Sequence, residues 1–120
     1  MISFRKKKKE LSVDERESCL IILKKIKENL IVSNMDAQVN VINNLLTLIN
    51  HKNDKCFIKK INGIEMWGGS GAVWEIYIED KDITKDFEAN MIKLINELER
   101  IGILGKGIKP IRKIFKGNIK

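Results

Sequence analysis

Carboxylates and a serine gather around one glycine-rich stretch of the sequence, "MWGGSGAVWEIYIED" (residues 66–80). Paired acids can carry out general acid–base chemistry, and a serine hydroxyl can act as a nucleophile when a base lies beside it. The serine here is Ser70, and the acids are Glu65, Glu75, Glu79, Asp80 and Asp82. The nucleophile-elbow pattern G-x-S-x-G fails, because Ala72 stands where the second glycine is needed. The single histidine, His51, lies outside the stretch, so no base can be assigned and we predict no catalytic residue.

The glycines also suggest a phosphate-binding loop. Such a loop follows a strand and opens a helix, so that backbone N–H groups face the anion. Here a strand-like segment follows Gly71, and no Lys-Ser or Lys-Thr pair ends the loop. Neither a P-loop nor a dinucleotide site is therefore predicted, and no cofactor is indicated. Because His51 has no second ligand at suitable spacing and Cys19 and Cys56 form no C-x-x-C pair, we also predict no metal site.

Recognition of a protein partner suits this stretch better. Trp67 and Trp74 flank glycines that permit close backbone approach, and tryptophan beside polar groups is typical of binding hot spots. The alternative is a core role, since Trp74 shares one face of the predicted strand with Ile76 and Ile78. The predicted partner-binding residues are Trp67, Ser70, Trp74, Glu75, Glu79, Asp80, Asp82 and Asp86.

Two helices are expected before this stretch. Ser12 and Glu15 form a capping-box pattern, and apolar residues recur at helical spacing behind it, so we predict a helix over about 12–31. A second apolar periodicity follows within residues 32–54, with Ser33 or Asn34 as the expected cap. The short joint between the two favours an antiparallel helical hairpin.

The remaining elements complete the predicted fold. "NDKCFIKKING" (residues 53–63) favours a short third helix with a left-handed stop at Asn62-Gly63. "AVWEIYIE" (residues 72–79) alternates apolar and polar residues as a strand does, and "GIEMW" (residues 63–67) is its expected antiparallel partner. A long helix follows, capped by Asp82 or Thr84 and ended by Gly102. We predict an α+β fold that is mostly helical, with one domain over 12–104, a basic extension at 1–11 and a basic tail at 105–120 that has room for a short helix.

The formal net charge of +7 comes from the two ends of the chain, because acids outnumber bases between residues 14 and 100. Basic ends can contact phosphates. The alternative function is therefore nucleic-acid binding, through Lys6, Lys7, Lys8, Lys9, Lys109, Arg112, Lys113 and Lys116. No apolar run is long enough for a signal peptide or a membrane span, so we expect a cytoplasmic protein without a membrane partner. The sequence does not indicate an oligomeric state.

The residues "GIEMWGGSGAVWEIYIED" and the helix that contains "FEANMIKLINELERIGIL" carry a resemblance to known proteins. With the pattern W-G-G-x-G-x-V-W-E over Trp67–Glu75, they resemble small bacterial immunity proteins of polymorphic and contact-dependent toxin systems. The similarity covers about 53–104. It implies a non-enzymatic protein that neutralises a cognate toxin by occluding it, and it brings no catalytic residue. Many immunity proteins against nucleases are acidic, so the basic ends argue against a nuclease as the target.

Overall fold

The first helix begins at the reciprocal cap that the sequence predicts. Ser12 Oγ accepts a hydrogen bond from the backbone N–H of Glu15 at 3.1 Å, and the Glu15 carboxylate accepts one from the backbone N–H of Ser12 at 2.9 Å. The computed structural model describes residues 10–119, with side chains up to Phe115. Helix α1 runs over Val13–Val32, which confirms the predicted first helix.

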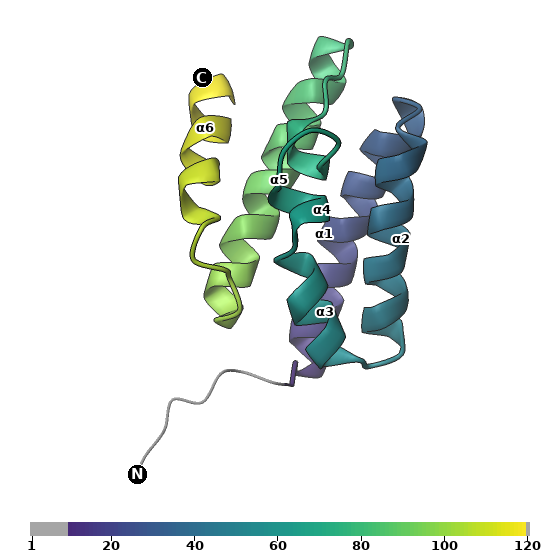
Figure 1. Cartoon of the computed structure of the whole chain (residues 1–120), viewed down its shortest axis with the longest axis vertical. Coiled ribbons are helices and arrows are strands. Elements are labelled where there is room, and N and C mark those ends of the chain that lie inside the picture. The colour runs from purple at the N-terminus through teal and green to yellow at the C-terminus, as the bar shows by residue number, and fades with distance from the viewer. Residues whose placement is uncertain (1–9, 120) are drawn as a thin grey trace.

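Helices follow one another along the rest of the described chain. They are α2 (Asp36–Asn50), α3 (Asp54–Ile61), α4 (Ile64–Trp67), the 3-10 turn η1 (Val73–Glu75), α5 (Lys81–Ile101) and α6 (Lys109–Ile119). In Figure 1, α1 and α2 lie antiparallel, α3 lies in front of α1, α4 lies above α3 between α5 and α2, and α6 lies on the other side of α5. Contacts join α1 to both α2 and α5, and α5 to α6. The predicted helical hairpin is therefore confirmed.

The predicted α+β fold with a β-hairpin is wrong, because no strand forms within residues 10–119. The segment expected as the first strand is α4, which turns Met66 into the core. The segment expected as the second strand starts with η1 and then continues as unpaired chain, with extended backbone angles at Ile76 and Asp80. Alternation arises because this chain runs across the core, with Ile78 buried and Tyr77 exposed. The pattern indicated extended backbone and not strand pairing.

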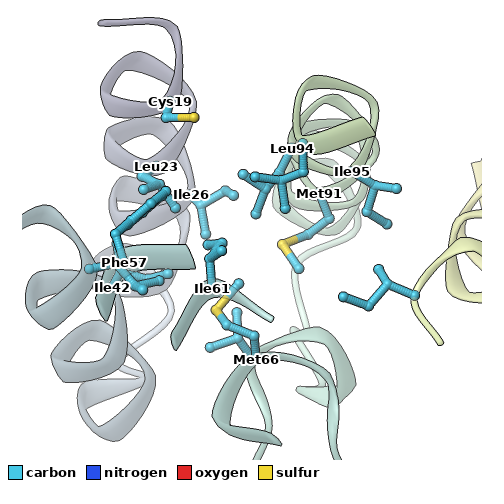
Figure 2. Packing of buried hydrophobic residues seen from close by; sticks show 14 of the residues in the cluster. Cys19, Leu23, Ile26, Ile42, Phe57, Ile61, Met66, Met91, Leu94 and Ile95 are labelled. Atoms are coloured by element: carbon cyan, nitrogen blue, oxygen red, sulfur yellow. The ribbon is translucent and has the colours of Figure 1, made fainter. Parts of the chain in front are cut away.

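The core lies between α1, α2 and α5, and the short helices close it. Figure 2 shows Ile61 of α3 and Met66 of α4 in the space between Ile26 of α1 and Met91 of α5. Phe57 of α3 lies beside α1 and α2 and is fully buried. Because α3 and α4 contribute buried side chains that pack among those of the long helices, both are parts of the hydrophobic core.

Two buried polar groups connect helices that are far apart in the sequence. Asp54, at the start of α3, accepts hydrogen bonds at 2.8 Å from the backbone N–H of Leu11 and from the Arg16 guanidinium. Asn90 of α5 donates to the Asn29 side chain of α1 at 2.9 Å, and both residues are buried. Such pairs fix how the helices slide against each other, because any other register leaves a buried polar group without a partner.

The connection between α3 and α4 is held by one amide. Asn62 donates to the backbone oxygens of Ile58 and Ile103, at 2.9 and 2.8 Å, and accepts from the backbone N–H of Gly105 at 2.7 Å. The predicted left-handed stop is wrong, since φ of Asn62 is −97° and φ of Gly63 is −84°. Gly102, by contrast, ends α5 at φ 92°, as predicted. Of the helices described, none is both long and apolar enough to cross a membrane.

Candidate partner-binding surface

The indole groups of the glycine–tryptophan loop (residues 67–74) are engaged within the fold. Trp67 Nε1 donates to the backbone oxygen of Ile61 at 2.6 Å, and Trp74 Nε1 donates to that of Gly68 at 2.9 Å. Trp74 also meets Phe115 of α6 edge to face, with ring centroids 6.1 Å apart. Both tryptophans are half-buried against the core. Each ring therefore stabilises the loop and its contacts with other helices.

Two of the three glycines in the loop are required by its backbone. A Cβ atom on Gly68 would lie 2.7 Å from the backbone oxygen of Ile64, closer than atoms can approach. Gly71 has φ 89°, a conformation that L-residues rarely adopt, and its backbone oxygen accepts from the Gln38 side chain of α2 at 2.8 Å. Gly69 has open space around it. The loop is thus a fixed turn that is fastened to α2.

An open cavity lies next to this loop, at the end of the bundle where α1 turns into α2 and α5 begins (Figure 1). Its volume is about 550 Å³. We call this surface the acidic end and define it by six residues that line the cavity, Val32, Ser33, Asn34, Tyr77, Glu79 and Asp80. Two predicted residues, Glu79 and Asp80, belong to it.

The acidic end combines exposed apolar side chains with carboxylates. Tyr77 is 77% exposed and Val32 is 61% exposed, and both flank the cavity that Glu79 and Asp80 also line. The Ser33 hydroxyl oxygen is buried and has no hydrogen-bond partner among the described residues. A concave surface that offers an exposed aromatic ring beside negative charge has the features of a protein-recognition surface.

The predicted acids of α5 and its cap differ in the contacts that they make. Asp80 caps α5 by accepting from the backbone N–H of Ile83 at 2.9 Å, so the predicted caps, Asp82 and Thr84, are wrong. Asp86 accepts from the Asn29 side chain at 2.9 Å and so belongs to the polar contact between α1 and α5. Asp82 is exposed in the first turn of α5. Ser70, within the loop, and Glu75, next to it, are also exposed.

The cations predicted for nucleic-acid binding are partly engaged by acids. Lys109 pairs with Glu99 at 3.1 Å, and Arg112 bonds both Glu99 and Asn96 at 2.6 Å. Lys113 is exposed, whereas the side chain of Lys116 and all of Lys6, Lys7, Lys8 and Lys9 lie outside the described residues. The pairs with Glu99 hold α6 on α5, so two of the proposed phosphate contacts have a role within the fold.

Titratable groups along α1 and α5 respond to these contacts. Hydrogen bonds from Arg112 and then Lys109 lower the pKa of Glu99. The pKa of Glu97 is lowered first by hydrogen bonds from Arg100 and then by the Ser18 hydroxyl. Burial raises the pKa of the Cys19 thiol to about 12, so Cys19 stays protonated and unreactive at neutral pH. Within residues 10–119, no three His, Cys, Asp or Glu side chains are placed to hold a metal ion.

Sequence reasoning missed Tyr77 and the residues of the α1–α2 turn as members of the site. Tyr77 falls within the predicted strand over residues 72–79, and its position between Ile76 and the buried Ile78 directs it outward. Val32 falls in the segment predicted to hold the second helix, whereas it is the last residue of α1. The signal that was available is Asn34 in a short joint, because Asn adopts a positive φ more readily than most residues other than glycine, and it has φ 58° here.

Comparison with known proteins gives no relative for this chain: no family model, no curated protein and no solved structure matches it.

Proposed function

We propose that this chain is a non-enzymatic, cytoplasmic binding protein of immunity type, which neutralises a cognate bacterial toxin by occluding it. The observation that carries the proposal is the acidic end, where a cavity of about 550 Å³ lies beside the exposed ring of Tyr77 and the carboxylates of Glu79 and Asp80. The resemblance of the Trp67–Glu75 segment to immunity proteins supports the same function.

The acidic end determines the chemistry of the toxin surface that it binds. Its carboxylates attract a basic patch over several ångströms and so accelerate association. Tyr77 supplies the anchor, because an exposed aromatic ring gains a large contact area when it becomes buried. Blocking a toxin in this way needs no bond to be made or broken, only a rigid surface. The glycine–tryptophan loop provides that rigidity, since its backbone and its indoles are fixed from within.

The experiment uses the protein encoded beside this gene as the candidate toxin. Calorimetry measures its affinity for this chain, and a growth assay measures protection of cells that express it. We expect binding and protection, and we expect Tyr77→Ala with Glu79→Ala to weaken affinity roughly 30-fold. The matched control is Val13→Ala with Glu17→Ala, which removes another exposed apolar residue and another exposed acid. A neighbour that is neither bound nor neutralised, or equal losses in both double variants, would overturn the proposal.

The alternative function, nucleic-acid binding, requires lysine and arginine side chains that are free to contact phosphates. Glu99 holds both Lys109 and Arg112, so phosphate binding would have to break contacts between α5 and α6. A filter-binding titration with a mixed-sequence DNA duplex at rising salt tests it, and a steep loss of affinity with salt would favour this function over the first.

A further inference from the structure

A second surface of this molecule has the opposite charge to the acidic end. It lies along α3 and α4 and surrounds a cavity of about 510 Å³. We call it the basic face and define it by the six residues that line this cavity, Cys56, Lys59, Lys60, Gly63, Ile64 and Glu65. The two lysines exceed the one acid, and both are exposed.

The basic face has an exposed apolar side chain, Ile64, as the acidic end has Tyr77. Ile64 is 83% exposed, more than any other large hydrophobic residue described. It adjoins a smaller cavity of about 270 Å³, to which Lys106 contributes a further cation. The basic face therefore presents an exposed isoleucine at a cavity that two lysines and one glutamate also line. The acidic end presents an exposed tyrosine and valine at a cavity that two acids line.

These complementary surfaces lead us to propose that the basic face of one copy binds the acidic end of a second copy. In such a contact Ile64 packs against Tyr77 and Val32, while Lys59 and Lys60 face Glu79 and Asp80. The apolar contact supplies affinity and the charges select the orientation. Lys81 and Lys85 also lie in the first turns of α5, but Asp82 and Asp86 lie there too. With Glu79 and Asp80, acids outnumber bases at this end.

The positions of the two surfaces determine the kind of assembly. The acidic end lies at one end of the long axis, and α3 lies toward the other (Figure 1). A contact between two different surfaces is head-to-tail, so copies add one after another into a ring where the rotation closes and into an open chain where it does not. The net charge of +7 opposes such assembly only weakly at physiological salt, where screening acts over about 8 Å.

The contact also has a regulatory consequence, which rests on the proposed function, whereas the association itself does not. The acidic end cannot hold a toxin and a second copy at once. Toxin binding therefore dissolves the assemblies, and assembly protects the exposed Tyr77 while no toxin is present.

Two charge-changing variants test the geometry in the purified protein without a partner. Lys59→Glu with Lys60→Glu breaks the basic face but leaves the acidic end intact. Tyr77→Lys with Glu79→Lys breaks the acidic end but leaves the basic face intact. Sedimentation velocity should show wild-type association that grows with concentration and falls with salt, and each variant alone should associate at least 10-fold more weakly. Mixed together, the two variants should associate again, because the intact acidic end of one variant meets the intact basic face of the other.

Matched controls separate surface effects from net charge. Lys24→Glu with Lys25→Glu makes the same charge change as the basic-face variant on exposed positions of α1, and Val13→Lys with Glu17→Lys does so for the acidic-end variant. Both controls should associate as the wild type does. Ile64→Ser, which changes no charge, should also weaken association, and circular dichroism establishes that each variant is folded.

Three results would overturn the head-to-tail contact. The first is a wild-type protein that stays monomeric up to about 1 mM, where even a contact worth 4 kcal/mol would be visible. The second is a basic-face or acidic-end variant that still assembles alone. The third is a mixture of two folded variants that stays monomeric although the wild type associates. None of these measurements involves the toxin, so their failure leaves the proposed function standing, and failure of toxin binding leaves this contact standing.

Discussion

The glycine–tryptophan loop and the acidic end are neighbours in sequence, yet they use their side chains in opposite ways. In the loop, the indole N–H of Trp67 donates to Ile61 at the end of α3 and that of Trp74 donates to Gly68, and a glutamine from α2 bonds the turn. At the acidic end, the aromatic ring of Tyr77 and the carboxylate of Glu79 are exposed. A conspicuous sequence motif can therefore be a structural device, and the surface that it supports can lie a few residues further along the chain.

The two aromatic residues provide the sharpest test of this comparison. Trp74→Ala should lower the free energy of unfolding by about 3 kcal/mol, since it removes a half-buried ring and its contact with Phe115. Tyr77→Ala should change it by less than about 0.5 kcal/mol, because the ring is exposed. Urea unfolding measures both. Trp74→Phe, which loses the N–H bond to Gly68 and part of the ring but keeps an aromatic side chain, should cost about 1 kcal/mol. Equal costs for the two alanine variants would contradict the distinction.

The glycines test whether the loop is fixed by its backbone. Gly68→Ala should cost about 2–3 kcal/mol, because its Cβ atom would meet the backbone oxygen of Ile64. Gly71→Ala should cost about 1–2 kcal/mol through its positive φ. Gly69→Ala is the matched control, and in its open surroundings it should stay within about 0.5 kcal/mol of the wild type. Thermal and urea unfolding measure these costs, and a Gly69 cost as large as that at Gly68 would contradict the fixed turn.

The acids can be separated into structural and recognition groups in the same way. Asp86→Ala should destabilise the protein by about 1 kcal/mol, because the buried Asn29 loses its carboxylate partner. Asp82→Ala removes only a favourable charge in the first turn of α5 and should cost about 0.5 kcal/mol or less. Chemical denaturation with each single variant checks this order. The reverse order would place Asp86 with the recognition residues.

Acidification should show the smallest effect, and it reports on α5 away from both regions. The pKa of Glu97 is lowered below its usual 4.5 in the folded chain. The stability that this group adds is therefore present above pH 4.5 and is lost as pH falls through the folded pKa. Unfolding measured between pH 7 and pH 2.5 should reveal a loss below pH 4.5 that is smaller in Glu97→Gln and in Arg100→Gln. An unchanged pH dependence in both variants would remove Glu97 as its source.

Local signals in the sequence predicted much of the helical framework. Ser12 and Glu15 set the start of α1 by two short-range bonds, and Gly102 ends α5 in a left-handed conformation that glycine adopts without strain. Such signals depend on neighbours within four residues, which a sequence shows directly. The predicted cap of α2, Ser33 or Asn34, is wrong: the flanking residue is Met35, which makes no side-chain cap bond, so no local capping signal marks the start of this helix.

The missing hairpin and the site have a different physical origin. Residues 72–79 alternate as strands do, but pairing requires a second extended segment. The expected partner forms helix α4, in which Met66 is buried in the core. Burial of Met66 involves side chains from other helices, which local spacing does not show. The acidic end joins Val32 with Tyr77, two residues from separate elements, and its cavity exists only once α1, α2 and α5 have met. Sequence spacing identified Glu79 and Asp80 as candidates but could not place them together with the α1–α2 turn.

The side chain of Asn62 links the position of α6 to the end of α3. Its amide contacts Ile103 and Gly105 in the connection that leads to α6, across 41 and 43 residues of sequence. Helix α6 otherwise depends on α5 and on the ring of Trp74. Native-state hydrogen exchange should therefore find α6 opening as one cooperative unit. Loss of this amide would release that unit while α1, α2 and α5 remain protected, so a protease should cleave α6 before it cleaves those three helices.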